Sequence, residues 1–149
     1  MKKIVTLLLK VVAVLLAVVG LVLLFVNFRG VPSYEVNIPE NIKNVKVEVT
    51  PQRVARGEKI ALVMCNACHA NQDNRLVGKH IDDLPAEFGK AYSLNITQDA
   101  EDGIGSWTDG EIMYFLKTGI KRNGQYAPIM PKFPRMADED LKSIIAYLH

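Results

Sequence analysis

The stretch Cys65-Asn66-Ala67-Cys68-His69 holds both cysteines of this 149-residue chain. On a helical turn, residues three and four positions apart share a face, so both sulfurs and the imidazole project from one side. This spacing is the attachment signature of a c-type haem. It predicts that Cys65 and Cys68 form two thioether bonds along one edge of the macrocycle and that His69 ligates the iron from the same face.

Two other uses of a Cys-x-x-Cys pair agree less well with the sequence. A structural zinc site needs four ligands, and the two remaining histidines, His80 and His149, are isolated. A thioredoxin-like redox pair belongs to a βαβ context, and no such pattern follows His69. The motif therefore predicts one covalently attached haem c.

The iron of such a haem has a second face, which takes another ligand or stays open to a small gas molecule. Methionine is the thioether donor that accompanies histidine in electron-transfer haems. Four methionines are candidates, namely Met64, Met113, Met130 and Met136. Met64 precedes Cys65 on the histidine side of the ring, and Met113 falls in an expected helix.

Met130 is the favoured ligand because it lies in the proline-rich stretch YAPIMPKFP, residues 126–134. The prolines forbid regular helix, so we expect an extended loop that can lie across the haem face. Met136 directly precedes the last expected helix and is the less favoured alternative. His80 and an open distal face are the remaining alternatives.

Three short helices are expected around the haem, and the fold class predicted is all-α. The first helix begins at Thr50-Pro51 and leads to Cys65. The second begins with a capping box at Thr108 and Glu111 and ends before Gly119. The third, over 137–148, carries an apolar stripe of Leu141, Ile144, Ile145 and Leu148. Such helices bury little apolar surface by themselves. We therefore expect the haem to complete the core and the apo-domain to be unfolded or molten.

The N-terminal region is long and apolar enough to span a membrane. As a helix, residues 4–28 would reach roughly 37 Å, against a hydrocarbon core of about 30 Å. Lys10 disfavours insertion by at most about 3 kcal/mol, whereas the Val, Leu and Phe residues of 11–28 contribute roughly −4 to −8 kcal/mol. A cleaved signal peptide is the alternative, but its apolar region is usually about 7–15 residues and ends in a small-x-small site, which this stretch does not offer.

The charges around this helix predict its orientation. Lys2 and Lys3 favour a cytoplasmic N-terminus, although Arg29 on the outer side argues weakly the other way. We expect a single-pass anchor over 1–29 in a bacterial inner membrane, an extended linker over 30–50, and a haem domain over 51–149 that faces the periplasm. Covalent haem attachment takes place outside the bacterial cytoplasm, which agrees with export.

The charge balance indicates which partners to expect. The whole chain carries a formal net charge of +2, but residues 1–30 contain four bases and no acid, which leaves 31–149 at −2. A mildly acidic domain lacks the basic surface that a nucleic-acid backbone requires. We therefore expect no nucleic-acid partner.

Two further motifs carry a family resemblance. They are Ser93-Leu94-Asn95-Ile96-Thr97 and the stretch GIGSWT at 103–108, followed by Met130-Pro131 and the acidic start of the last helix. With the haem motif, they make the chain from Val54 onward similar to a class I cytochrome c. More narrowly, it resembles the haem domains in the cytochrome c subunits of membrane-bound alcohol, aldehyde and gluconate dehydrogenases.

The resemblance implies a cytochrome c fold over 51–149, with covalent haem on Cys65 and Cys68 and iron ligation by His69 and Met130. It implies a one-electron carrier rather than an enzyme, passing electrons from an oxidoreductase to an oxidase or another cytochrome in a respiratory chain. The alternative is an electron-accepting haem subunit of a membrane-bound dehydrogenase. A haem sensor or peroxidase with an exchangeable ligand is a third, more distant interpretation. Trp107 is expected either to bond a haem propionate or to pack in the core.

Overall fold

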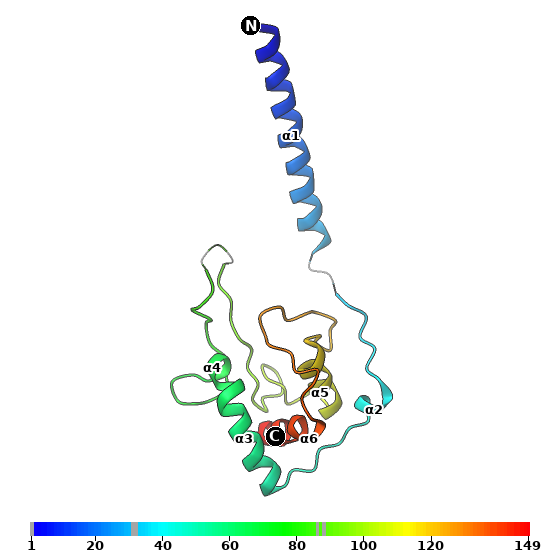
Figure 1. Ribbon diagram of the computed structural model, residues 1–149, viewed down its shortest axis with the longest axis vertical. Helices are drawn as coiled ribbons and strands as arrows, with labels where there is room; N and C mark the ends of the chain where they lie inside the picture. The colour runs from blue at the N-terminus through cyan, green and yellow to red at the C-terminus, as the bar shows by residue number, and fades with distance from the viewer. Residues whose placement is uncertain (1, 31–32, 86, 88) are drawn as a thin grey trace. The chain divides into compact units, whose positions relative to one another are not determined.

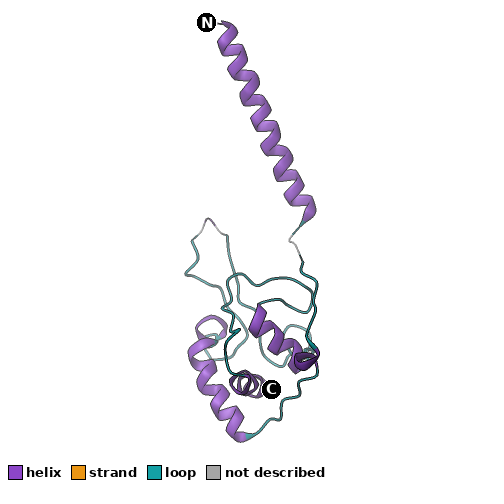
Figure 2. Ribbon diagram, turned by 45° about the vertical axis from the view of Figure 1, so that its right-hand side comes forward, coloured by secondary structure: helices purple, strands orange, loops and turns teal. Residues whose placement is uncertain are grey.

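The computed structural model describes residues 2–30, 33–85, 87 and 89–149 of the chain. Within these residues the secondary structure is helical, with isolated β-bridges, among them His80 with Tyr92 and Ile120 with Tyr126, and no strand. The helices, shown in Figures 1 and 2, are α1 (Lys2–Arg29), α2 (Glu40–Lys43), α3 (Pro51–Met64), α4 (Asn66–His69), α5 (Asp109–Thr118) and α6 (Asp138–Leu148). The prediction of an all-α fold with an N-terminal apolar helix is confirmed. The chain forms two compact units, Met1–Tyr34 and Glu35–His149.

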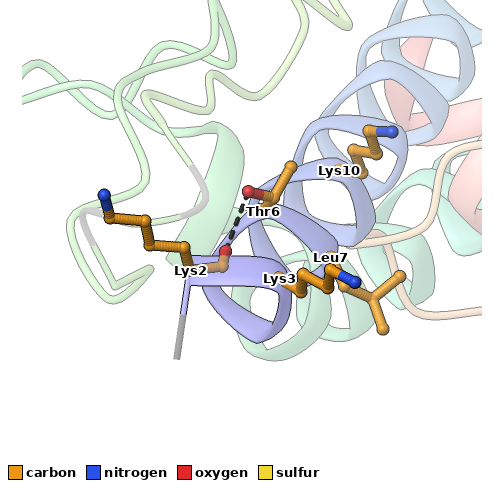
Figure 3. A pocket seen from close by; sticks show the side chains of 5 residues that line it. All are labelled: Lys2, Lys3, Thr6, Leu7 and Lys10. Carbon is orange, nitrogen blue, oxygen red and sulfur yellow. Dashed lines mark hydrogen bonds between the residues drawn. The ribbon is translucent and has the colours of Figure 1, made fainter.

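The first unit consists mainly of α1, which by length and composition could cross a membrane. No residue of α1 is buried, so its Val, Leu and Phe side chains face outward on every turn. Its N-terminal turns carry the basic side chains Lys2, Lys3 and Lys10 around a shallow hollow, as Figure 3 shows. There the Thr6 hydroxyl donates to the Lys2 carbonyl (2.9 Å), which satisfies a side-chain donor within the helix itself.

In the second unit α6 packs against both α3 and α5, and the core forms along this helix. The stripe predicted on α6 is buried, with Leu141 and Ile145 fully inaccessible. On α3 the buried positions are Gly57 and Ala61, two small residues that let the helix approach α6 closely. A Cβ atom on Gly57 would overlap the Ser143 carbonyl, so this contact requires glycine.

The helix ends follow the predicted signals. The Thr50 hydroxyl accepts a hydrogen bond from the Arg53 N–H (3.3 Å) at the start of α3, and Pro51 is the first helical residue. Thr108 and Glu111 form a reciprocal capping box at the start of α5. After α5, Gly119 takes the left-handed conformation (φ +74°) that ends many helices.

The segment before α3, which the sequence predicts as an extended linker, packs against α5. It contains the single turn α2, which the sequence did not indicate, and its residues 45–50 have no regular secondary structure. The Val47 N–H donates to Asp109 Oδ2 (2.7 Å), and Val45 and Val47 contact the core. Val45 and Val47 thus pack on the core, whereas Val49 is exposed. Residues 31 and 32 of the expected linker lie outside the described residues.

Candidate haem site

The cysteine and histidine motif lies on a helical turn, as its spacing predicts. α3 ends at Met64, and the Cys65 N–H still donates to the Ala61 carbonyl (2.8 Å). The Cys65 carbonyl then accepts from the N–H groups of Cys68 (3.1 Å) and His69 (2.9 Å), which forms α4. Both cysteines are free thiols. The turn therefore holds two sulfurs and one imidazole in the arrangement that the motif implies.

These side chains line a largely apolar cavity of about 320 Å³ in the second unit. Its wall combines the motif with α5, the end of α6 and three loop regions of the chain. Those regions are residues 92–96, residues 102–104 together with Trp107, and residues 126–131 together with Phe133. Cys65, Cys68, His69 and Met130 all belong to this wall, so the four predicted site residues share one cavity.

His69 is held by a backbone group from a distant part of the chain. Its side chain is buried, and Nδ1 lies 2.8 Å from the Leu94 carbonyl oxygen. Because a carbonyl only accepts, Nδ1 carries the proton and Nε2 keeps its lone pair for a metal. Burial lowers the pKa of His69, an effect that the Leu94 hydrogen bond partly opposes. The ring therefore has a fixed orientation, and its Nε2 lone pair is available to a metal.

The two thiols differ in their exposure to solvent. Cys65 is buried, whereas Cys68 is half-buried. Burial raises the pKa of the Cys65 thiol to about 11, and the nearby Cys68 adds to the shift. Thiolates are the form that zinc binds, and the described part of the chain contains no cluster of three or more His, Cys, Asp and Glu side chains that could hold a metal ion.

Met130 is presented by a loop that two backbone hydrogen bonds attach to α5. The Ala127 N–H donates to the Gly119 carbonyl (2.8 Å), and the Phe133 N–H donates to the Leu116 carbonyl (2.9 Å). Between these points the chain has no regular structure, and Met130 is half-buried against the core. The loop therefore supplies a thioether to the cavity that also contains His69.

The other candidate ligands occupy different positions. Met136 and His80, both described residues, do not line the cavity, and the His80 ring lies 2.6 Å from Asp82 Oδ1. Met113 is buried in the core, as expected for a helix residue. Met64 does line the cavity, next to Cys65, with 39% of its surface exposed.

Two site features were not found from the sequence. The Leu94 carbonyl could not be predicted, because every residue has a carbonyl and nothing in the sequence marks this one as an acceptor. Ser93 was noted only as part of a family motif, yet its hydroxyl bonds the Cys68 carbonyl.

Trp107 lines the cavity and packs edge-to-face on Phe115, with ring centroids 5.8 Å apart.

The residues present fit a covalently bound haem. Two free thiols and a histidine with an available Nε2 stand on one turn, a thioether belongs to the same wall, and apolar side chains complete the cavity. Buried apolar surroundings, an imidazole and a thioether are the features by which proteins bind haem iron and adjust its potential.

Comparison with known proteins gives a consistent result. Residues 52–148 match a family model described as "Cytochrome C oxidase, cbb3-type, subunit III". The chain is 35% identical over 119 residues to the fructose dehydrogenase cytochrome subunit of Gluconobacter japonicus, which covers 72% of this chain and 24% of that protein.

Two further relatives are similar over a shorter stretch. The cytochrome c subunit of the quinone alcohol dehydrogenase of Gluconobacter oxydans is 34% identical over 98 residues, with 63% of this chain and 20% of that protein covered. The gluconate 2-dehydrogenase cytochrome c subunit of Pantoea cypripedii is 32% identical over 98 residues, with 63% and 22% covered. The chain thus spans about a quarter or less of these relatives.

The resemblance to the haem domains of dehydrogenase cytochrome c subunits is therefore confirmed. The chain contains an electron-carrier domain homologous to those subunits, and its family implies haem c. The match extends from the start of α3 to the end of α6 and includes the whole wall of the cavity. Over these residues the chain belongs to the cytochrome c family described as subunit III of the cbb3-type cytochrome c oxidase.

Proposed function

We propose that this protein carries single electrons through one covalently bound, His/Met-ligated haem c. The observation that carries the proposal is the common cavity of Cys65, Cys68, His69 and Met130. The cysteines would attach the macrocycle, while His69 and Met130 would ligate the iron. The chain has two cysteines and one Cys-x-x-Cys-His motif, which supports a single haem per chain.

The haem, when bound, supplies a one-electron couple between ferric and ferrous iron. The protein's own residues hold and enclose it. The Leu94 carbonyl orients His69, the loop at 126–133 presents Met130, and apolar side chains such as Ile112 and Leu116 keep water from the cavity. With both axial positions filled by protein, no substrate site is needed, so we propose a carrier rather than an enzyme.

We propose that α1 anchors this domain to a bacterial inner membrane, with the haem domain in the periplasm. The unburied apolar surface of α1 supports insertion into lipid. Lys2 and Lys3 lie at the N-terminal end of α1, which favours a cytoplasmic N-terminus. The partners would be a donor such as a dehydrogenase and an acceptor such as an oxidase or another cytochrome.

A second candidate function is supported by the relatives. The proteins described above are cytochrome subunits of fructose, alcohol and gluconate dehydrogenases. By this analogy the chain would be the electron-accepting haem subunit of a membrane-bound dehydrogenase. The chemistry is the same in both cases, and the difference is whether the dehydrogenase is bound stably or met transiently.

The test is to produce the full chain in a bacterium that attaches haem c and to compare it with the double variant Cys65→Ser/Cys68→Ser. We expect haem that stays with the wild-type polypeptide after denaturation, at one haem per chain, and a one-electron redox titration. The double variant should lose covalent haem. Wild-type protein without covalent haem would refute the proposal.

The two candidate functions are then distinguished by purification from the native membrane. A dehydrogenase in fixed stoichiometry with the chain supports the subunit function, whereas an isolated chain supports the free carrier. Rapid carbon monoxide binding by the ferrous protein at neutral pH would instead indicate an exchangeable ligand and a sensor.

A further inference from the structure

Ser93 connects the haem-binding turn to the segment that orients its histidine. Its hydroxyl donates to the Cys68 carbonyl (2.5 Å) and accepts from the Lys79 N–H (2.8 Å). Its backbone N–H donates to the Lys79 carbonyl (2.9 Å). Two groups of one small residue, its hydroxyl and its backbone N–H, thus join the turn, the chain at 79 and the chain at 93 by hydrogen bonds.

The Cys68 carbonyl needs this donor because it lies in the last turn of a helix. The final carbonyls of a helix have no intrahelical partner, and a buried one is satisfied by a side chain, by water or by a turn. The carbonyl of Asn66 accepts from Ala70 and that of His69 accepts from Gly78, both through backbone N–H groups. For Cys68 the donor is the Ser93 side chain.

The neighbouring residue carries the acceptor of the axial histidine. Leu94 follows Ser93 directly, and its carbonyl lies 2.8 Å from His69 Nδ1. Beyond it, the Ile96 N–H donates to the Leu76 carbonyl (2.9 Å), and Asn95 accepts from the Thr97 N–H (2.9 Å). The carbonyl that orients His69 therefore lies between two attachment points, and the one at Ser93 is made to the haem-binding turn itself.

We infer that Ser93 is a positioning residue for His69: by bonding the Cys68 carbonyl, it fixes the Leu94 carbonyl against His69 Nδ1. The inference rests on the proposed haem function. When the ring nitrogen that does not bind the metal donates a hydrogen bond, the basicity of the metal-bound imidazole rises. A more basic imidazole favours ferric over ferrous iron, so loosening this bond should raise the reduction potential.

The test compares Ser93→Ala with Ser93→Thr, which keeps the hydroxyl. Ser143→Ala is the matched control, because the Ser143 hydroxyl also donates to a backbone carbonyl (Glu139, 2.7 Å) and Ser143, a described residue, does not line the cavity. Each variant is prepared as the full haem-loaded chain. Two quantities are measured: the ferric/ferrous equilibrium, and the hydrogen-exchange rate of the His69 Nδ1–H by NMR of the reduced protein.

We expect Ser93→Ala to shift the equilibrium toward ferrous iron by roughly two- to tenfold, which corresponds to the net contribution of one hydrogen bond. The same variant should speed exchange of the Nδ1 proton by at least a similar factor. Ser93→Thr should restore both values, and Ser143→Ala should change neither. If Ser93→Ala does not accumulate, Ser93→Val provides the comparison, because valine is the isostere of threonine without the hydroxyl.

The possible failures are distinguishable. Haem-loaded Ser93→Ala with wild-type equilibrium and exchange rate would overturn the inference and leave the haem function intact. Equal shifts in Ser93→Ala and Ser143→Ala would also overturn it, because the effect would then be general loosening. Absence of covalent haem from the wild-type chain would overturn the proposed function and this inference with it.

Discussion

The Nδ1 atom of His69 lies 2.8 Å from the carbonyl oxygen of Leu94, a residue 25 positions later in the chain. This contact assigns the proton to Nδ1 and leaves Nε2 available to iron. It also joins two features that the sequence shows separately, the haem-attachment turn and the motif at 93–97. The second iron ligand that we propose would come from another part of the chain.

Met130 is predicted to supply that second ligand. In Met130→Leu, the oxidised protein should lose the charge-transfer absorption typical of methionine-ligated ferric haem, and its reduction potential should fall because thioether ligation raises it. Optical spectra and redox titration of the purified haem-loaded chain provide the measurement. Met136→Leu is the control, since Met136 does not line the cavity. The assignment would be wrong if the control lost the band and Met130→Leu kept it.

Gly57 is predicted to be required for the packing of α3 on α6. In a helix interior, alanine normally stabilises by about 0.5–1 kcal/mol relative to glycine. Here the added Cβ would overlap the Ser143 carbonyl and approach Tyr147 Cβ to 2.8 Å. Overpacking of this kind costs about 1–3 kcal/mol. Gly57→Ala should therefore lower the free energy of unfolding, whereas the exposed control Glu58→Ala should leave it nearly unchanged in denaturant titrations. A more stable Gly57→Ala would contradict the close approach.

Asp109 is predicted to hold the segment before α3 on the domain. Its Oδ2 accepts from the Val47 N–H (2.7 Å), and its Oδ1 lies 2.8 Å from His149 Nε2. Removing an acceptor from a half-buried N–H costs about 1–3 kcal/mol. Asp109→Ala should lower stability by that amount and speed hydrogen exchange at the Val47 amide. The exposed Asp83→Ala serves as control, and an unchanged Val47 amide would exclude this role.

The Lys117–Asp138 ion pair, between the end of α5 and the start of α6, should stabilise the domain in a pH-dependent way. The hydrogen bond from Lys117 Nζ (2.6 Å), together with its charge, lowers the pKa of Asp138 below the ordinary value. A carboxyl group whose pKa is lowered by folding stabilises the folded state at pH values above its unfolded pKa of about 3.9. This stabilisation disappears as the pH falls through the pKa of the folded state.

Because both groups reach solvent, the coupling should stay below about 1 kcal/mol and weaken with salt. A double-mutant cycle of Lys117→Met and Asp138→Asn at pH 7, repeated down to pH 3, measures it. The coupling should be constant from pH 7 to about pH 5 and decline below pH 4. A coupling that grew on acidification would show that the pair does not act as described.

Features specified by a few neighbouring residues could be predicted from the sequence. The haem-attachment turn, the capping box at Thr108 and the left-handed Gly119 are of this kind, because spacing within one or two helical turns determines them. The stripe on α6 was predictable for the same reason. In contrast, α2 spans only four residues, too few for an apolar period to show, and it depends on packing against α5.

The role of Gly57 also depends on tertiary contact. Within the sequence it is a weak helix former in the middle of an expected helix. Its packing role depends on the Ser143 carbonyl, which lies against Gly57 in the folded protein. The apolar side chains of Val54 and Ile60 on α3 are only half-buried, whereas the buried positions are the small residues Gly57 and Ala61. The face that a helix buries is set by the shape of its neighbour as well as by its own hydrophobic pattern.

By itself, the sequence determined the Cys-x-x-Cys-His spacing, the helical class and the apolar N-terminal segment, because each depends on residues close together in the chain. The tertiary structure decided which backbone carbonyl orients His69, that Met130 rather than Met136 shares its cavity, and that Asp109 binds a segment 62 residues away. These contacts join distant residues through backbone groups or shared walls, and such pairs leave no local pattern by which to predict them.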